Sequence, residues 1–272
     1  MTKKQSFTLD AAGYVDELSF AKSELDEVHL PIVASLFQLA QKYRRLIVLL
    51  TGPSGTGKTT LAALWGQLAA GRKQAPSFCV LPMDGFHLPH KTLEEKKVSV
   101  HGREESLARF KGAPETFDLE LLRHKIEGLA HDEEVKWPRY DRILHDPVPD
   151  AIQVPTSGII IVEGLYLLLD RPGWRDLRSY AHWGIFVEVP EDLAQARVVA
   201  RHMRGGRTRE SAEQHWKRSD AVNTQLVNAY RHGIDVLLKR DTSGRLLSSA
   251  KNASAQFRTL LTAKPKAKGA SD

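Results

Sequence analysis

The chain has 272 residues, 42% of them hydrophobic and 26% charged, with 39 Lys and Arg against 33 Asp and Glu and a net charge of +6. This composition is typical of a globular protein with a sizeable core. The stretch from Lys239 to the end carries eight basic and two acidic residues and therefore accounts for the whole charge excess. A nucleic-acid-binding face is for this reason not expected in the rest of the chain. The sequence has no apolar run long enough to span a membrane, and no apolar segment follows the N-terminal lysines as in a secretory signal. It has a single cysteine. We therefore expect a cytoplasmic protein with no membrane partner and no intrachain disulfide.

The N-terminal part, residues 1–44, is predicted to be a helical extension. The stretch ELSFAKSELDEV before Pro31 has a mixed composition, and after it the apolar residues at 32, 33, 36, 37, 39 and 40 follow a helical spacing. We expect this extension either to cover a sheet edge or to form part of a homodimer contact.

Apolar strands and helices alternate from residue 45 onward. The run RLIVLLT at 45–51 is bounded by Gly-Pro, which is typical of a strand buried on both faces, and a helical pattern follows at 59–70. Further apolar runs at 77–83, 158–164 and 182–190 alternate with helical patterns at 118–130 and 191–203, whereas residues 85–112 lack periodicity and residues 135–150 are loop-rich. The alternation predicts an α/β fold, a doubly wound parallel sheet with helices on both faces, whose sites lie beyond the carboxyl ends of the strands.

The turn between the first strand and its helix matches the G-x-x-x-x-G-K-[ST] pattern of a P-loop. Glycines allow successive N–H groups to point at phosphate oxygens, so the loop is predicted to bind ATP, with the lysine bridging the β- and γ-phosphates and the threonine after it offering its hydroxyl to Mg²⁺. The alternative is a glycine-rich turn with an exposed lysine. The predicted ATP-binding residues of the loop are Gly52, Pro53, Ser54, Gly55, Thr56, Gly57, Lys58, Thr59 and Thr60.

Two carboxylates follow strands that end at the same predicted sheet edge. Asp84 comes directly after the run at 77–83 and is predicted to accept the proton of an attacking hydroxyl, although an aspartate that caps the turn beside Gly85 is an equal alternative. Glu163 ends the run at 158–164, where we predict an outer-sphere Mg²⁺ ligand or a water-ordering group, with a turn-forming acid as the alternative.

A glycine pair followed by the long helical pattern at 204–230 predicts a helical lid. Residues 197–218 contain seven basic and two acidic residues. Arginines on such a flap neutralise charge on the transferred phosphoryl group and exclude water, a role that we assign to Arg201 and Arg204. Arg209, Lys217 and Arg218 are interpreted as a solvated basic face.

Three histidines in the polar stretch, His87, His90 and His101, raise the question of a metal site there. Their spacing matches no common ligand pattern, and the only cysteine, Cys79, lies within an apolar run, so we expect neither a zinc site nor a nucleophilic thiol.

Seven segments together resemble the superfamily of phosphoribulokinase, uridine kinase and bacterial pantothenate kinase. Their order matches over about residues 45–240, and the resemblance is strongest to pantothenate kinase. The segments are GPSGTGKTT, MDGFHLPH, FKGAPETFDLELL, PRYDRILHDPVPD, IIIVEGLYLLL, VEVPEDLAQARVVARHMRGGRT and NTQLV. The resemblance implies ATP and Mg²⁺ as cofactors, Asp84 as the base, and Lys58 and Arg201 as transition-state stabilisers. It further implies an acceptor site that includes Asp84, Phe86, His87, Lys111, Tyr140, Arg142 and Asn223.

The sequence departs from pantothenate kinases at two points. Arg142 stands where those enzymes carry a histidine, and the interior of the P-loop reads PSGT. An arginine in the acceptor site suits a substrate with many hydroxyls or with an anionic group. The resemblance therefore predicts a sister group whose acceptor is a sugar, a nucleoside or a pantothenate-like molecule.

The chain is thus divided into a helical extension at 1–44, a P-loop kinase domain at 45–240, and a basic C-terminal segment at 241–272 that ends in a disordered tail. The predicted function is transfer of the γ-phosphoryl group of ATP to a hydroxyl of a small molecule. The alternative is a regulatory or assembly P-loop ATPase without such an acceptor.

Overall fold

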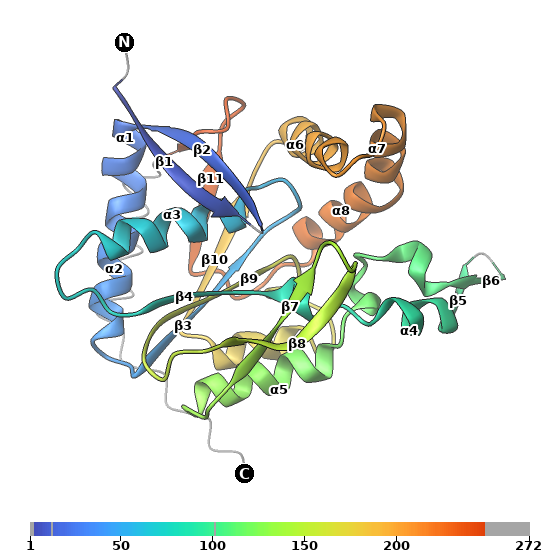
Figure 1. The fold of residues 1–272 in the computed structure, drawn as a ribbon, viewed down its shortest axis with the longest axis horizontal. Helices are drawn as coiled ribbons and strands as arrows, with labels where there is room; N and C mark the ends of the chain where they lie inside the picture. Colours follow the sequence, from blue (N-terminus) through green and yellow to red (C-terminus); the bar gives the residue numbers. More distant parts are fainter. Residues whose placement is uncertain (1–2, 12, 101, 248–272) are drawn as a thin grey trace.

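The computed structural model describes residues 3–11, 13–100 and 102–247, and its centre is a mixed sheet of six strands (Figure 1). Five strands run parallel in the order β11 (Val236–Arg240), β10 (Trp183–Glu188), β3 (Arg45–Thr51), β9 (Gly158–Gly164) and β4 (Phe78–Pro82). The short strand β12 (Leu246–Leu247) pairs antiparallel with β11 at one edge. The predicted parallel sheet is confirmed; the parallel strand β11 and the antiparallel edge strand β12 were not among the predicted strands.

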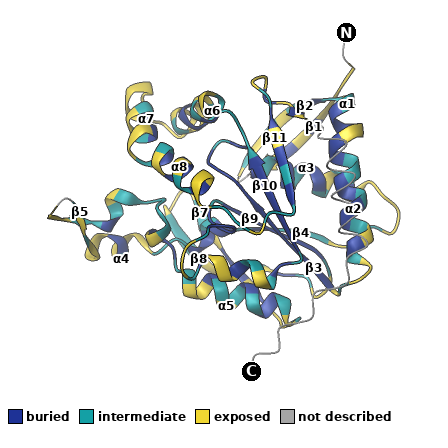
Figure 2. Cartoon of the chain, turned by 180° about the vertical axis from the view of Figure 1, so that it is seen from behind, coloured by how far each residue is buried: buried dark blue, intermediate teal, exposed yellow. Residues whose placement is uncertain are grey.

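Both faces of the sheet are covered, which explains the continuous apolar runs. Along β3, Ile47 and Leu49 pack into one core cluster with residues of α5 (Leu119–Ala130), whereas Leu46 and Val48 pack into a second cluster with α2 (Leu30–Ala40) and α3 (Lys58–Ala70). Successive side chains of a strand point to opposite faces, so each face of a buried strand needs its own apolar residues. The central strands β3, β9 and β10 are accordingly almost entirely buried (Figure 2).

The N-terminal part differs from the predicted helical extension. Residues 4–21 form an antiparallel hairpin of β1 (Lys4–Ala11) and β2 (Tyr14–Ala21), and helix begins only at α1 (Lys22–Glu24), continuing through a π-helical turn at 25–29 into α2. The helical prediction was therefore wrong for residues 4–21. The physical reason is a period of two: Phe7, Leu9 and Phe20 alternate with polar residues and pack on Leu64 of α3.

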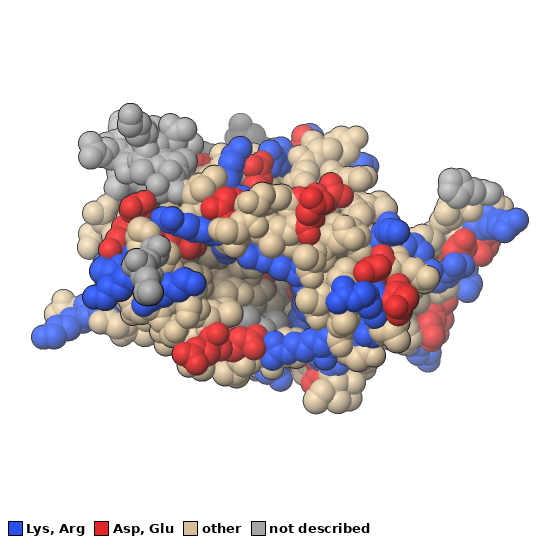
Figure 3. Space-filling view, turned by 90° about the horizontal axis from the view of Figure 1, so that it is seen from above, with Lys and Arg blue, Asp and Glu red and all other residues tan. Residues whose placement is uncertain are grey.

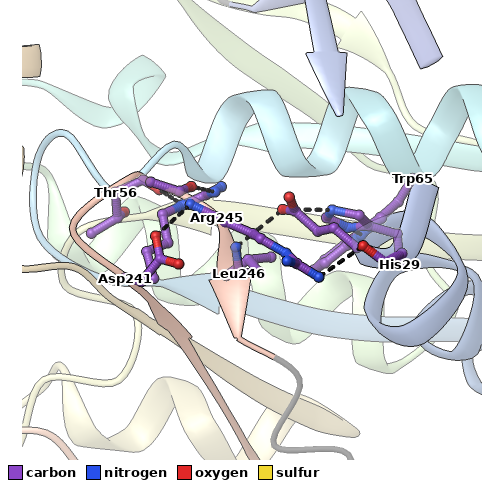
Figure 4. Close-up of polar contacts among 10 residues, drawn as sticks. His29, Thr56, Trp65, Asp241, Arg245 and Leu246 are labelled. Atoms are coloured by element: carbon purple, nitrogen blue, oxygen red, sulfur yellow. Dashed lines mark hydrogen bonds and ion pairs between the residues drawn. The ribbon is translucent and has the colours of Figure 1, made fainter. Parts of the chain in front are cut away.

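Buried polar contacts tie this N-terminal part to the last described strand (Figure 4). Trp65 Nε1 donates to His29 Nδ1 at 3.1 Å, which leaves Nε2 of His29 to donate to Glu24 Oε1 at 3.3 Å. The same carboxylate oxygen accepts from the backbone N–H of Leu246 at 3.1 Å. The extension is thus packed on α3 and linked to β12; a homodimer contact through it stays a prediction.

Residues 135–150, predicted to be loop-rich, form a second hairpin of β7 (Lys136–Asp141) and β8 (Asp146–Gln153). The register shifts between Trp137 and Arg139, around Pro138, because proline has no N–H for the strand ladder. A two-stranded pair tolerates such residues since each strand has a free edge. A third hairpin, β5 (Lys97–Val100) with β6 (Arg103–Ser106), follows the short helix α4 (His90–Glu95) in the stretch that lacked periodicity.

The predicted lid consists of α6 (Glu191–Arg204), α7 (Arg209–His215), a π-helical segment (Trp216–Asp220) and α8 (Ala221–Ala229). Gly205 and Gly206 separate α6 from α7, and the group lies to one side of the sheet in Figure 1. Within the described part of the chain, no helix has the length and apolar character needed to cross a bilayer. The predicted disordered tail lies outside the described residues.

Candidate active site

The P-loop joins the carboxyl end of β3 to the first residue of α3. Gly55 and Gly57 have φ of +79° and +85°, a region that residues with a Cβ rarely adopt, and a Cβ on Gly55 would lie 2.6 Å from the carbonyl oxygen of Ala194 in α6. Thr56 Oγ1 donates to Pro53 O at 3.0 Å and closes the loop on itself. The glycines are therefore required both by the backbone turn and by the close approach of the lid helix.

Lys58 is buried at the start of α3, and its Nζ donates to the carbonyl oxygens of Gly52 at 2.9 Å and Pro53 at 3.0 Å. Burial lowers the pKa of Lys58 to about 8; the positive charge of Arg201 adds to this, whereas Glu163 and Asp84 oppose it. An anionic phosphate would raise this pKa and keep the ammonium charged.

Thr59 and Glu163 form the next contact. Thr59 Oγ1 donates to Glu163 Oε1 at 3.1 Å, across the adjacent elements α3 and β9. Burial raises the pKa of Glu163 to about 7, with Asp84 adding to it and Lys58 opposing it. One hydroxyl and one carboxylate oxygen are hard ligands of the kind that Mg²⁺ prefers, so the residues present fit that ion.

Asp84 lies in a 3-10 turn, Met83–Phe86, that follows β4. Strand β4 pairs with β9 so that Pro82 stands opposite Glu163, which brings Asp84 to the same sheet edge as the P-loop. Its carboxylate shifts the pKa of both Lys58 and Glu163, and its Oδ2 lies 3.8 Å from Nη2 of Arg142. The predicted convergence of Asp84 and Lys58 on one site is therefore consistent with the arrangement of these charges.

The turn after Asp84 requires a glycine at position 85. A Cβ there would overlap the carbonyl group of Pro138 in β7, so the turn and the β7–β8 hairpin are in direct backbone contact. Trp137 Nε1 donates to Pro82 O at 2.9 Å, and its ring packs edge-on against Phe86 at 4.8 Å. Phe86 is buried, so it supports the turn rather than facing an acceptor directly.

Four of the predicted acceptor residues come together beside this hairpin. Lys111 Nζ donates to the hydroxyl of Tyr140 at 2.8 Å, and the ring of His87 lies edge-on to Tyr140 at 5.5 Å. Burial lowers the pKa of His87, with Lys111 and Arg142 adding and Asp84 opposing, so its imidazole is neutral near pH 7. Among the described residues, the buried Nδ1 of His87 has no hydrogen-bond partner.

Asn223, from α8, contacts the backbone of the loop that carries Lys111. Its Nδ2 donates to Gly112 O at 3.2 Å, the same oxygen that accepts from the Tyr166 hydroxyl at 2.6 Å. Asn223 therefore fixes the loop that carries Lys111 and links the lid to the predicted acceptor side.

The two lid arginines are placed differently. The charge of Arg201 lowers the pKa of Lys58, and its role at the phosphates stays a prediction. Arg204 instead pairs with Asp16 of β2 at 2.7 Å and lies over the ring of Tyr14 at 4.3 Å. One helical turn separates the two residues, and the hairpin that sequence reasoning missed supplies the partners of Arg204. Arg204 is thus held by the N-terminal hairpin, and its predicted role in ATP binding stays a prediction.

Two further arginines contact the P-loop. Arg240, buried at the end of β11, donates from Nε to Thr56 O at 2.9 Å, and Arg197 donates from Nη1 to Gly55 O at 3.3 Å. Burial lowers the pKa of Arg240 to about 10, with Arg197 adding to it. The sequence analysis included Arg240 only among the basic residues of the C-terminal stretch and predicted no contact for it. The sequence signal that could have identified it is a basic residue at the end of an apolar strand.

Viewed from above, the molecule has a hollow near its centre whose rim carries Lys and Arg side chains (Figure 3). Lys58, Glu163, Asp84 and Arg201 come from four different elements, and the charges of the other three act on Lys58. This arrangement can bind a polyanion and hold a carboxylate beside it.

Comparison with known proteins agrees with this geometry. The sequence profile of the Phosphoribulokinase / Uridine kinase family matches residues 47–242. The chain is 36% identical over 243 residues to the uncharacterized protein YggC of Escherichia coli K12, which covers 87% of this chain and 96% of that one. It is 32% identical over 208 residues to a provisionally named uridine kinase, C227.14, of Schizosaccharomyces pombe, which covers 75% of this chain and 86% of that one.

A solved structure from Silicibacter sp. TM1040, provisionally described as a fructose transport system kinase, has the same fold. It superposes with a TM-score of 0.65 at 32% identity and covers 76% of this chain and 98% of its own. The P-loop, the parallel sheet and the matched region of residues 47–242 lead to one conclusion: the chain belongs to the phosphoribulokinase/uridine kinase family.

Proposed function

We propose that this protein is an ATP-dependent kinase that transfers the γ-phosphoryl group to a hydroxyl of a small molecule. The observation that carries the proposal is the position of Asp84, which follows β4 at the sheet edge that bears Glu163 and lies 3.8 Å from Arg142 in the turn of the β7–β8 hairpin. Its charge also acts on the buried Lys58. A nucleotide switch needs the P-loop but has no use for a base beside a second, acceptor-like site.

In the proposed site, Asp84 accepts the proton of the attacking hydroxyl. Lys58 and Arg201 stabilise the negative charge on the transferred phosphoryl group, which is the main source of catalysis in phosphoryl transfer. Thr59 and Glu163 hold Mg²⁺, which neutralises charge on the β- and γ-phosphates when it is bound. Closure of the lid over the P-loop excludes water, so that ATP is not hydrolysed.

The acceptor side carries two cations, Lys111 and Arg142, besides the neutral imidazole of His87. Guanidinium and ammonium groups donate to carboxylate and phosphate oxygens and to clustered hydroxyls. We therefore favour a polyhydroxylated or anionic acceptor, such as a sugar or a sugar acid. The provisional description of the Silicibacter relative as a fructose transport system kinase supports including ketoses among the candidates.

The test is an acceptor screen with Mg·ATP. Sugars, sugar acids, nucleosides and pantothenate are supplied singly, ADP formation is followed, and the product is checked by mass spectrometry for one added phosphoryl group. We expect one class to raise ADP formation far above background, and Lys58→Ala to abolish the increase. If ATP binds but no hydroxyl compound accelerates ADP formation, the kinase proposal fails and the regulatory ATPase alternative gains.

A further inference from the structure

Three potential metal ligands converge within the lid, away from the P-loop. His202 lies in α6, His215 ends α7, and Asp220 ends the following π-helical segment. Nε2 of His202 lies 3.1 Å from Asp220 Oδ2, Nε2 of His215 lies 3.8 Å from the same oxygen, and the ligand atoms of all three residues lie within 4.8 Å of one another.

These distances fit a tetrahedral ion. With ligand bonds of about 2.0–2.1 Å, two ligand atoms of tetrahedral Zn²⁺ are separated by about 3.3 Å. The two observed separations from Asp220 Oδ2 lie on either side of that value, so small side-chain rotations suffice to complete three ligand positions. A fourth position is open to water, as in sites with three protein ligands.

The donor set selects the metal. Two imidazoles and one carboxylate suit Zn²⁺, whereas Mg²⁺ prefers oxygen ligands only and fits the pair Thr59 and Glu163 instead. Asp220 is buried, and the two imidazoles are partly buried, with their ring centroids 4.7 Å apart.

We propose that His202, His215 and Asp220 form a Zn²⁺ site that joins the two parts of the lid. The three ligands lie on both sides of Gly205 and Gly206, so a bound ion would hold the end of α6 against α7 and the π-helical segment. His202 follows Arg201 directly in α6, and occupancy of the site therefore restricts the motion of the helix that carries Arg201 to the phosphates.

The first experiment measures zinc binding to the full chain after treatment with a chelator, without nucleotide. A chromogenic chelator competes for Zn²⁺, and Co²⁺ is used as a spectroscopic substitute. We expect one high-affinity Zn²⁺ per chain, a rise in the melting temperature with Zn²⁺ but not with Mg²⁺, and the intense visible absorption of four-coordinate Co²⁺. No tight Zn²⁺ binding to the wild-type chain would overturn the proposal and leave a hydrogen-bonded His-Asp-His cluster.

Matched variants locate the ion. His202→Gln retains an N–H that can donate to Asp220, and His215→Gln keeps a polar side chain in place of a group that makes no hydrogen bond to Asp220, so the fold is kept while an imidazole ligand is lost in each. We expect each to weaken Zn²⁺ affinity by about tenfold or more and to remove the Co²⁺ absorption, whereas His131→Ala, at an exposed histidine outside the lid, changes neither. Equal affinity in the wild type and both glutamine variants would place the ion elsewhere and refute the site.

Hydrogen exchange tests the effect on the lid. Zn²⁺ is expected to slow amide exchange in residues 201–217 of the wild type and to leave exchange in His202→Gln unchanged. Tight binding without slower exchange in this segment would contradict the proposed restriction of the lid.

Discussion

Replacing Asp84 by asparagine removes the proposed base while keeping the shape of the side chain. The structural cost of this change is small. The ion pair with Arg142 is long, at 3.8 Å, and the two side chains are 43% and 44% exposed, so the pair stabilises the fold by about 1 kcal/mol at most.

The catalytic cost is expected to be much larger. A positioned general base contributes about 10²–10⁴ to the rate, equivalent to about 2.7–5.5 kcal/mol at 1.36 kcal/mol per factor of ten. Because the loss of catalysis exceeds any loss of stability, we expect Asp84→Asn to lower kcat by about 100-fold or more with the melting temperature and the ATP dissociation constant nearly unchanged.

The assay is ADP formation with the acceptor found in the screen, with nucleotide binding and thermal unfolding measured in parallel. Asp150→Asn serves as the matched control, because this exposed carboxylate pairs with Lys125 at 3.4 Å and has no contact with the P-loop among those described. Retention of more than about a tenth of the wild-type kcat in Asp84→Asn would refute the role of Asp84 as the base, since such a loss lies below the range for a positioned base.

Three further changes test other parts of the site. Arg201→Ala is expected to lower kcat by about 10²–10³-fold with little change in ATP affinity, since its charge acts mainly in the transition state; a change confined to affinity in binding measurements would demote it to a binding residue. The raised pKa of Glu163 means that its carboxylate takes up a proton as the pH falls through about 7. The apparent Mg²⁺ affinity in steady-state assays should therefore decline over that range in the wild type and not in Glu163→Gln, and parallel profiles would contradict the assignment. Gly85→Ala should push the β7–β8 hairpin away, destabilise the protein by about 1–3 kcal/mol and raise KM for the acceptor more than for ATP. Gly71→Ala, where the nearest atoms to an added Cβ lie at 3.9 Å, is the control, and equal KM values in the two variants would argue against contact with the acceptor side.

The sequence alone was sufficient for the P-loop and for four strands of the sheet, β3, β4, β9 and β10, whereas β11 and β12 were not predicted. Both depend on residues that are adjacent in the chain: the glycines and Lys58 follow one another in a single turn, and the buried positions 46–50 are all apolar because helices cover both faces of the strand. Such local requirements are readable from spacing. The N-terminal hairpin could also have been predicted, because Phe7 and Leu9 alternate with polar residues as in a strand. The mixed stretch after them instead led to a helical prediction for the whole N-terminal part.

Only the tertiary structure decided which charges meet. Arg201 and Arg204 differ by three positions in one helix, yet the first acts on Lys58 and the second is held by Asp16. Arg240 comes from the last parallel strand to bind the carbonyl of Thr56. Contacts of this kind join residues far apart in the chain, and whether they form depends on the packing of the hairpin, the lid and the sheet together, which no local periodicity records.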